Sequence, residues 1–520
     1  MLSTFLKLHN LEYLLVNSTN EFLVEYNTLG ENSRYKLTNF SGSTGEALVT
    51  PETIYLFVDG RYHIQADTEV NHEKVTVVKL QAGQNYLEEL VKKIPQSAVL
   101  GLFSKKNPQQ KVEFLKSKFE IKLLDEDIFD KNNKIIDNNA ENIELSKDLT
   151  GLTSDEKIKI ISSKLKDDEA IFLTDLDEVS YLFNMRNLSQ NYSSKVKAKA
   201  IIYNDKAELF LQKDLKNLDK ILKEINKKVY IDKTSINAYD FNLLNEKAVE
   251  MKSNPVKQMK AQKTKEELEH FKDAFNKTDK ALTAIRDFIE NNDNLSEFDI
   301  AQQLEIEYKK QGAKNLSFQS IVAIDDNSAI VHYSKSSKDK KLKDGSLVLI
   351  DSGAYFEGGL ATDITRVFVK GTPNKKQKFI YTTVLRAFLS AFNYAKTHSQ
   401  RPVIGIDIHK EVAKFFDNIE LDGFVFNHGL GHGIGINVHE EPPRLNNCES
   451  GKAQILDNMC FSIEPGLYKN GEFGVRLENS CYFKDDNIHS FVKMNYEQKL
   501  IDNDLLTEQE KQWLLEFEVR

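Results

Sequence analysis

Cysteine is scarce in this chain of 520 residues, and its spacing forms no motif. The three cysteines, Cys448, Cys460 and Cys481, are odd in number and contain no Cys-x-x-Cys pair. This pattern argues against a disulfide framework and against a thiolate zinc site. The cytosol is therefore the expected compartment.

Long apolar runs and an excess of positive charge are also absent. No stretch approaches the roughly 18 apolar residues of a membrane span, and the start, MLSTFLKLHN, does not read as a signal peptide. Lys and Arg number 70 against 79 Asp and Glu, which gives a net charge of −9. So acidic a chain is a poor general binder of nucleic acid or anionic membranes. We expect neither partner.

What is present suits a multidomain α/β (α+β) protein. Hydrophobic residues make up 40% and charged residues 29% of the chain, which is enough for real cores. The length suggests three domains. A polar segment over 125–148 and the Asn254-Pro255 pair mark their boundaries. The predicted domains are 1–149, 150–255 and 256–520.

The first two domains repeat one order of elements. Short buried strands are predicted over 11–16 and 54–58 in the first domain. The second domain is expected to contain a helix over 154–166, a strand over 171–174, and paired strands over 199–203 and 208–211. The strand before Ser18 corresponds in position to the strand before Asp175, which suggests two related modules.

The third domain begins with a predicted amphipathic helix. Thr264-x-x-Glu267 is a capping box that marks its start. The apolar residues that follow recur at helical spacing and form one buried stripe: Leu268, Phe271, Phe275, Leu282, Ile285 and Ile289. A coiled-coil partner helix is the alternative interpretation.

The third domain also contains an internal echo. A turn aspartate, a buried strand and a terminal carboxylate follow one another from Asp344 to Asp351 and again from Asp457 to Glu464. Seven positions separate the two acidic residues in both copies. This repetition predicts a pseudo-two-fold domain that delivers both carboxylates to a shared centre.

Four acidic residues at apolar strands and one histidine stand out in this domain. They are Asp351, Asp363, His432, Glu464 and Glu478. Carboxylates buried without a positive charge are costly, and the local sequence does not supply a Lys or Arg for each. An oxygen-rich set with one imidazole suits two hard or borderline ions such as Mn²⁺, Co²⁺ or Zn²⁺. Two ions about 3.5–4 Å apart would turn a bridging water into hydroxide near neutral pH.

Three further histidines lie near these positions in the sequence. His332 is in an apolar segment, AIVHY, and His428 and His439 flank His432. Near a metal centre they become candidate donors to a peptide carbonyl or an oxyanion. The glycines at 429, 431, 433 and 435 are expected to let the backbone approach a substrate closely.

These residues lie in segments that resemble a known family. AIVHYS, LIDSGAYFEGGLATDITR, HGLGHGIGINVHEEPP, FSIEPGLY and GVRLEN resemble the pita-bread metallopeptidases, in particular the three-domain aminopeptidases P. LTNFSGSTGEALVT, VDGRYHIQA and TDLDEVSYLFNMR are similar to their two creatinase-like N-terminal modules. The resemblance implies a pita-bread catalytic domain and removal of the N-terminal residue from peptides whose second residue is proline.

The resemblance also implies residue roles. Asp351 would be a terminal ligand of one metal, Asp363 and Glu478 would bridge, and His432 and Glu464 would complete the second metal. Glu464 would also shuttle a proton, and His332, His428 and His439 would orient substrate and stabilise the transition state. Tyr468 and Arg476 would line the proline pocket with His428. The family implies Mn²⁺ as the metal.

Some features depart from the family pattern. Twelve positions separate Asp351 from Asp363, where eleven are expected, which predicts a one-residue insertion in the intervening hairpin. The family implies a homodimer whose contacts partly use a C-terminal extension, and this chain stops soon after Trp513, which leaves dimerisation open.

Several alternatives stay open at this point. The nearest is a prolidase, and the others are a non-catalytic binding protein on the same fold and a creatinase-like hydrolase without metal. A lysine-rich loop over 335–343 is either a solvated hairpin or a surface that steers the carboxylate of a peptide.

Overall fold

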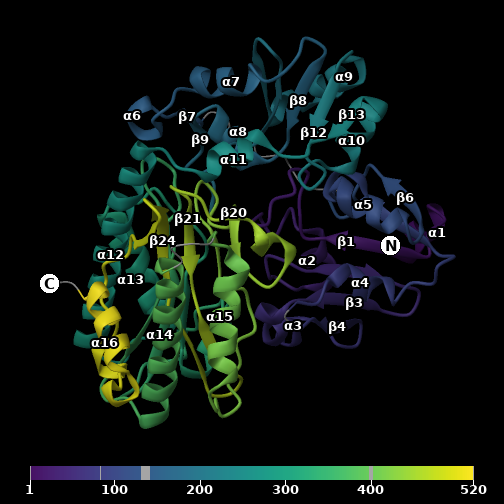
Figure 1. The fold of residues 1–520 in the computed structure, drawn as a ribbon. Helices are drawn as coiled ribbons and strands as arrows, with labels where there is room; N and C mark the ends of the chain where they lie inside the picture. Colours follow the sequence, from purple (N-terminus) through teal and green to yellow (C-terminus); the bar gives the residue numbers. More distant parts are fainter. Residues whose placement is uncertain (1, 82, 131–140, 398–401, 519–520) are drawn as a thin grey trace. The chain divides into compact units, whose positions relative to one another are not determined.

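The computed structural model describes residues 2–81, 83–130, 141–397 and 402–518 (Figure 1). The chain divides into two compact units. The first unit comprises Met1–Asn142, Thr153–Met185 and Val196–Val256, and the second comprises Ile143–Leu152, Arg186–Lys195 and Lys257–Arg520. The three domain boundaries stay predictions. Part of the predicted connection over 125–148 lies outside the described residues.

The first module of the first unit is built on a six-stranded sheet of order β4-β3-β2-β1-β5-β6. Its strands are β1 (Tyr13–Asn17), β2 (Glu46–Val49), β3 (Ile54–Val58), β4 (Val75–Lys79), β5 (Val99–Phe103) and β6 (Glu120–Leu124). Its helices are α1 (Leu2–Leu8), α2 (Ser33–Thr38), α3 (His63–Glu69), α4 (Tyr86–Val91) and α5 (Gln109–Lys116). Along β1, Leu15 packs with residues of α4 and α5, whereas Leu14 and Val16 pack with residues of α1. Both faces of β1 are therefore buried, which explains its continuous apolar sequence.

The second module repeats this topology in a five-stranded sheet of order β11-β10-β8-β12-β13. Its strands are β8 (Glu169–Leu173), β10 (Ala198–Ile202), β11 (Ala207–Leu211), β12 (Lys228–Ile231) and β13 (Ala248–Glu250). Strand β8 pairs antiparallel with β10 and parallel with β12, as β1 pairs with β2 and β5. The helices are α7 (Ser154–Ser162), α8 (Leu176–Leu182), α9 (Leu215–Glu224) and α10 (Ala238–Leu244). The predicted repetition of two related modules is confirmed.

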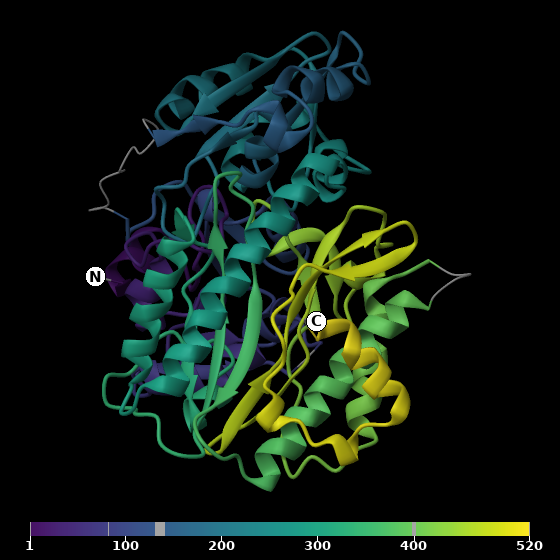
Figure 2. The ribbon, with the colours of Figure 1, turned by 90° about the vertical axis from the view of Figure 1, so that its left-hand side faces the viewer.

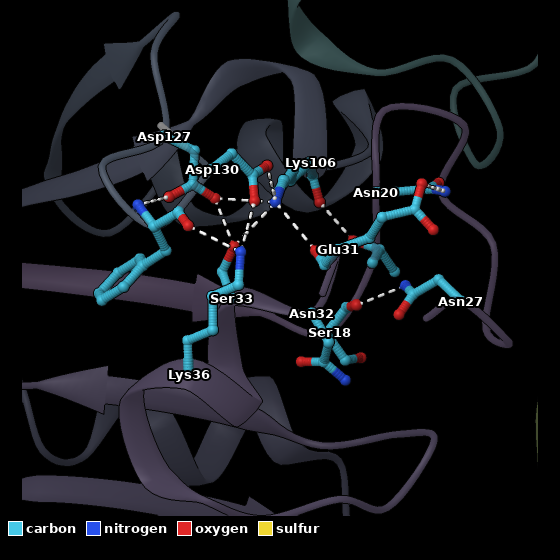
Figure 3. Close-up of polar contacts among 12 residues, drawn as sticks. Ser18, Asn20, Asn27, Glu31, Asn32, Ser33, Lys36, Lys106, Asp127 and Asp130 are labelled. Atoms are coloured by element: carbon cyan, nitrogen blue, oxygen red, sulfur yellow. Dashed lines mark hydrogen bonds and ion pairs between the residues drawn. The ribbon is translucent and has the colours of Figure 1, made fainter. Parts of the chain in front are cut away.

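A buried lysine stabilises one end of the first module (Figure 3). Lys106 is 4% exposed, and its Nζ lies 2.8 Å from Asp127 and 2.5 Å from Asp130. It also donates a hydrogen bond to the hydroxyl of Ser33 at 2.8 Å. We call these four residues the Lys106 cluster. Its carboxylates are balanced by a cation of the chain itself.

The second unit contains the long helix expected from the capping box. Helix α12 (Lys265–Asn291) begins after Thr264, whose side chain accepts from the backbone N–H of Glu267. All six residues of the predicted apolar stripe are buried, so α12 packs on the core of its own unit and the coiled-coil alternative is not needed. The other helices of this unit are α6 (Lys147–Thr150), α13 (Glu297–Lys310), α14 (Lys375–Lys396), α15 (Gly405–Asp417) and α16 (Glu508–Leu514). Helix α11 (Pro255–Ala261) begins with the last residues of the first unit and continues into the second. In both views α12 and α13 run side by side, and α14 lies beside α15 (Figures 1 and 2).

Two antiparallel sheets of the second unit contain the strands in or beside which the four candidate carboxylate ligands lie. One has the order β15-β16-β18 and the other the order β20-β19-β21-β24-β25. Their strands are β15 (Ile321–Ile324), β16 (Leu347–Ser352), β18 (Ile364–Val369), β19 (Gly431–Gly433), β20 (Glu440–Leu445), β21 (Cys460–Ile463), β24 (Asn479–Lys484) and β25 (Asn487–Ser490). A hairpin of β22 (Gly466–Lys469) and β23 (Phe473–Arg476) connects β21 to β24. The remaining strands are the short β7 (Ile143–Glu144), β9 (Met185–Arg186), β14 (Asn315–Leu316) and β17 (Ala354–Tyr355).

Candidate metal centre

The internal echo explains where the four carboxylates lie. Strands β16 and β18 pair antiparallel, as do β21 and β24. Each pair supplies one carboxylate near the end of its first strand and one directly before its second strand. Asp351 lies within β16, whereas Asp363, Glu464 and Glu478 lie one residue outside β18, β21 and β24. The last three are therefore in connections and not in the strands themselves, which leaves their side chains free of the sheet alternation.

The two halves meet at their acidic ends. The backbone N–H of Glu478 donates to the carbonyl of Thr365 at 3.2 Å, and the hydroxyl of Ser480 donates to the carbonyl of Asp363 at 2.8 Å. These bonds join the start of β24 to the start of β18. The echoed carboxylates consequently lie around one centre.

His432 lies among the carboxylates. Its Nε2 is 3.5 Å from Oδ2 of Asp363 and 3.4 Å from Oε1 of Glu464. Single ligand atoms of Asp363, His432 and Glu478 all lie within 4.8 Å of one another. The Nδ1 of His432 lies 3.0 Å from the carbonyl of Gly433, which can only accept. Nδ1 therefore carries the proton, and the lone pair of Nε2 faces the carboxylates, as in metal-binding imidazoles.

Two of the four carboxylates are only partly satisfied by the residues that the structure describes. Oδ1 of Asp351 and Oε1 of Glu478 are buried and have no hydrogen-bond partner among the residues that the structure describes. Burial, followed by the charge of Glu478, raises the pKa of Asp363 well above its ordinary value. Burial, followed by the charge of Glu464, does the same to the pKa of Glu478. These orphaned oxygens and this repulsion fit a site for divalent cations.

Arg476, which was predicted to line the proline pocket, forms an ion pair with a candidate metal ligand. It is 1% exposed, and its Nη2 pairs with Oδ2 of Asp351 at 2.6 Å. Nη1 donates to the hydroxyl of Tyr468 at 2.8 Å and to the carbonyl of Val331 at 3.3 Å, and Nε donates to the hydroxyl of Thr365 at 3.1 Å. Arg476 thus orients Asp351 and anchors the backbone next to His332.

His428 is used within the chain at both ring nitrogens. Nδ1 lies 2.6 Å from the carbonyl of Gly429, and Nε2 lies 2.9 Å from the hydroxyl of Tyr468. Since the carbonyl can only accept, Nδ1 donates to it, and Nε2 accepts from Tyr468. Burial raises the pKa of that hydroxyl to about 12, so it stays protonated. In this arrangement His428 orients Tyr468, and the oxygen of Tyr468 accepts from Arg476.

The other two histidines are only half-buried. The ring of His439 packs edge-on against His432, with 4.5 Å between the ring centroids. His332 lies in a turn after the 3₁₀ helix η6 (Asp325–Ala329). Val331, directly before it, is fixed by Arg476. Both rings are candidates for contact with a substrate.

The glycines between 429 and 435 lie in close contact with neighbouring parts of the chain. A Cβ at Gly431 would lie 2.0 Å from the carbonyl oxygen of Ser462, and a Cβ at Gly435 would lie 2.2 Å from the carboxylate of Glu440. A side chain at either position would therefore displace β21 or Glu440. The glycines allow close internal packing, in addition to the substrate approach that we expected.

Two loops near the site differ in exposure: the hairpin between Asp351 and Asp363 is buried apart from Glu357, whereas most of the lysine-rich loop over 335–343 is exposed or partly exposed. The predicted insertion between Asp351 and Asp363 is a hairpin closed by a bridge between Tyr355 and Ala361, with Gly359 at a φ of +65°. In the lysine-rich loop, Lys340 pairs with Asp326 and Lys341 with Asp299. These local pairs favour a solvated loop over a steering surface.

Models of known protein families match most of this chain. The profile of metallopeptidase family M24 matches residues 269–485, and profiles of the Creatinase/Prolidase N-terminal domain match residues 2–128 and 133–225. The chain contains a domain of metallopeptidase family M24 over these residues, 269–485. The M24 match includes all five candidate ligands, and the creatinase-type matches include the whole six-stranded sheet and strands β8, β10 and β11 of the five-stranded sheet.

Named relatives match over nearly the whole chain. Xaa-Pro aminopeptidase 1 of Dictyostelium discoideum is 26% identical, with 99% of this chain and 91% of the relative aligned. Aminopeptidase P1 of Lotus japonicus is 26% identical, over 98% of this chain and 93% of the relative. The crystal structure of X-prolyl aminopeptidase from Caenorhabditis elegans, described as a cytosolic enzyme with a di-nuclear active site, has a TM-score of 0.87 at 21% identity. It covers 98% of this chain and 90% of its own, and it establishes the fold.

Sequence reasoning missed two parts of the site. One is the pairing of Arg476 with Asp351, which no local spacing reveals because 125 positions separate them. The other is Glu440, which is buried directly after His439. Its place in the run His439-Glu440-Glu441 looks like solvated charge, and nothing in the sequence links it to the lysines that it contacts.

Proposed function

We propose that this chain is a dinuclear-metal aminopeptidase that hydrolyses the N-terminal Xaa-Pro bond of peptides. The observation that carries the proposal is the group of buried carboxylates around His432, with oxygens of Asp351 and Glu478 that have no partner among the described residues. The relatives named for Xaa-Pro aminopeptidase activity match the chain almost end to end, which supports this substrate class.

The residues present fit two divalent ions. Asp351 would hold one ion, Asp363 and Glu478 would be shared, and His432 and Glu464 would hold the second. When bound, the ions would make a water molecule nucleophilic at neutral pH and polarise the scissile carbonyl. Mn²⁺ is the ion that we propose, with Co²⁺ or Zn²⁺ as alternatives that suit the same ligands.

The chain's own groups divide the remaining work. Glu464, the most exposed of the four carboxylates with 18% of its side chain accessible, would carry the proton toward the leaving amine. His439 and His332 would donate hydrogen bonds to the substrate carbonyl, where charge develops. His428, Tyr468 and Arg476 form one hydrogen-bonded chain that would shape the proline pocket.

Substrate length tests the proposal against a prolidase. Tripeptides and longer peptides with proline second should be cleaved at the Xaa-Pro bond, because two creatinase-type modules precede the M24 domain, whereas prolidases carry one. The measurement is product analysis with Xaa-Pro and Xaa-Pro-Yaa peptides after adding Mn²⁺, Co²⁺ or Zn²⁺ to metal-free protein. Turnover of dipeptides alone would favour the prolidase, and no turnover with any metal would favour a binding protein.

Compartment and assembly are part of the proposal. We propose the cytosol, because the Caenorhabditis elegans enzyme is described as cytosolic and the three cysteines of this chain are free thiols. None of the helices that the structure describes has the length and apolar run needed to cross a bilayer. A homodimer stays a prediction that light scattering on the purified protein checks.

A further inference from the structure

Glu440, the residue directly after His439, forms a buried ion triad with Lys260 and Lys263. Glu440 is the first residue of β20 and is 2% exposed. Its Oε2 lies 2.6 Å from Nζ of Lys263, and its Oε1 lies 3.0 Å from Nζ of Lys260. Both lysines are also buried, at 4% and 2% exposure. Such a triad is costly to bury, so its position next to a functional histidine calls for a reason.

The triad fixes the loop that presents His439. Oε1 of Glu440 accepts a hydrogen bond from the backbone N–H of Ile436 at 3.0 Å. The backbone carbonyl of Ile436 accepts a hydrogen bond from the hydroxyl of Tyr355 at 3.1 Å and one from the hydroxyl of Ser194 at 3.2 Å. The polar groups of Ile436 are thereby held by three buried side chains.

The remaining contacts tie this loop to the metal ligands. The carbonyl of Gly435 accepts from the backbone N–H of Ala361 at 2.8 Å, two residues before Asp363. The side-chain amide of Asn437 donates to the carbonyl of His439 at 3.0 Å. The loop contains Gly433 and Gly435, whose backbone freedom would otherwise leave it poorly ordered. External contacts must therefore supply its order.

We propose that Glu440, paired with Lys260 and Lys263, is a positioning residue that holds the His439 ring in place for the reaction. This inference rests on the proposed function, in which His439 donates to the substrate carbonyl. Glu440 does not itself touch the substrate. It fixes the peptide unit three residues before His439 and so limits where the imidazole can lie. Loose placement of a donor forfeits much of its effect.

The test compares two isosteric variants with His439→Ala. Glu440→Gln removes the charge that pairs with two lysines, and Tyr355→Phe removes one hydrogen bond to Ile436 without changing charge. Each is measured for metal content, kcat and KM on an Xaa-Pro-Yaa peptide, and thermal unfolding. The matched control is Asp240→Asn, which breaks the buried Lys199–Asp240 pair of the second module.

Glu440→Gln is expected to lower kcat by about 10- to 100-fold, less than the about 10²–10³-fold of losing a donor outright. Tyr355→Phe should lower kcat by about threefold. KM and metal content should stay near the parent values in both. Asp240→Asn should cause a similar fall in melting temperature with unchanged kcat. In the His439→Ala background, Glu440→Gln should lower kcat by less than about twofold, because the group it positions is gone.

Three results would overturn the inference: normal kcat in Glu440→Gln, an equal loss with and without His439, or loss of metal. If Glu440→Gln does not fold, normal kcat in Tyr355→Phe overturns it. A different outcome concerns the proposed function. If His439→Ala itself keeps full kcat, the role assigned to His439 is wrong, whatever Glu440 does.

Discussion

Two groups of buried carboxylates in this chain are balanced in opposite ways. In the Lys106 cluster, one ammonium lies within 2.8 Å of both Asp127 and Asp130. In the M24 domain, Arg476 pairs with Asp351, while burial and the charges of neighbouring carboxylates raise the pKa values of Asp363 and Glu478 well above their ordinary values. The first group is electrostatically complete within its module. The second is complete only with added positive charge.

This difference separates a structural site from a functional one. Buried ion pairs of the first kind stabilise a fold only as long as both partners remain. Carboxylates of the second kind cost folding free energy in the metal-free protein, and that cost is offset when cations bind. Burial of acidic residues alone would not distinguish them. The number and position of the neighbouring cations does.

The largest effect is expected from Asp363 and Glu478, the two carboxylates that we propose to be shared by the ions. Asp363→Ala or Glu478→Ala should lower kcat/KM by at least about a thousandfold, as removal of a catalytic centre does, and should reduce the bound metal. Asp127→Asn serves as the matched control, since it removes a buried carboxylate of the Lys106 cluster and should keep both metal and turnover. Two tightly bound ions and normal turnover in Asp363→Ala would contradict the assignment.

The histidines should separate ligation from substrate contact. His432→Ala removes the imidazole whose Nε2 faces Asp363 and Glu464, so it should lose metal as well as activity. His439→Ala should keep its metal and lose about 10²–10³ in kcat, and His428→Ala should lose less, because its ring orients Tyr468. Metal stoichiometry measured beside kcat decides between these roles. Loss of metal in His428→Ala with retention in His432→Ala would reverse the assignment.

The Lys106 cluster should respond in stability alone. Lys106→Met leaves the buried carboxylate of Asp127 without its ammonium and removes one of the two lysines beside Asp130, so it should cost about 3–5 kcal/mol of unfolding free energy. Lys36 also pairs with Asp130, at 3.3 Å, but it is partly exposed, so Lys36→Met should cost less than about 1 kcal/mol. Urea unfolding measures both. Equal costs for the two variants, or a fall in kcat of the folded Lys106→Met protein, would remove the contrast.

Much of the fold could be predicted from the sequence because its signals are local. The strand over 54–58 and the start of α12 after Thr264 were placed correctly, since alternation, apolar runs and a capping box act within a few residues. The helix predicted over 154–166 was too long, and it ends at Ser162. The five candidate ligands could be named because acidic residues at apolar strands stand out and because their segments resemble a family. Their partners could not, because Arg476 meets Asp351, and Lys263 meets Glu440, only through the tertiary fold.

A third buried carboxylate lies between the two extremes and gives the smallest effect. Asp279 of α12 accepts from the backbone N–H of Lys493 at 2.8 Å through Oδ2, but its Oδ1 has no hydrogen-bond partner among the described residues. Burial raises its pKa from 3.8 to about 6. Between these two pH values the folded protein holds a proton that the unfolded chain has released, so stability falls as pH rises through this window.

Asp279→Asn cannot ionise, so it should be more stable than the parent at pH 7, by up to about 3 kcal/mol for two pKa units. The advantage should shrink toward pH 4, where Asp279 is protonated in the folded parent. Urea unfolding of both proteins with a chelator present, at pH 7 and near pH 4.5, measures the difference at each pH and removes the contribution of metal. A difference that is the same at both pH values would show that Asp279 is already neutralised by Arg366, the arginine whose charge lowers its pKa. Asp279 would then belong with the carboxylates of the Lys106 cluster, which the chain balances by itself.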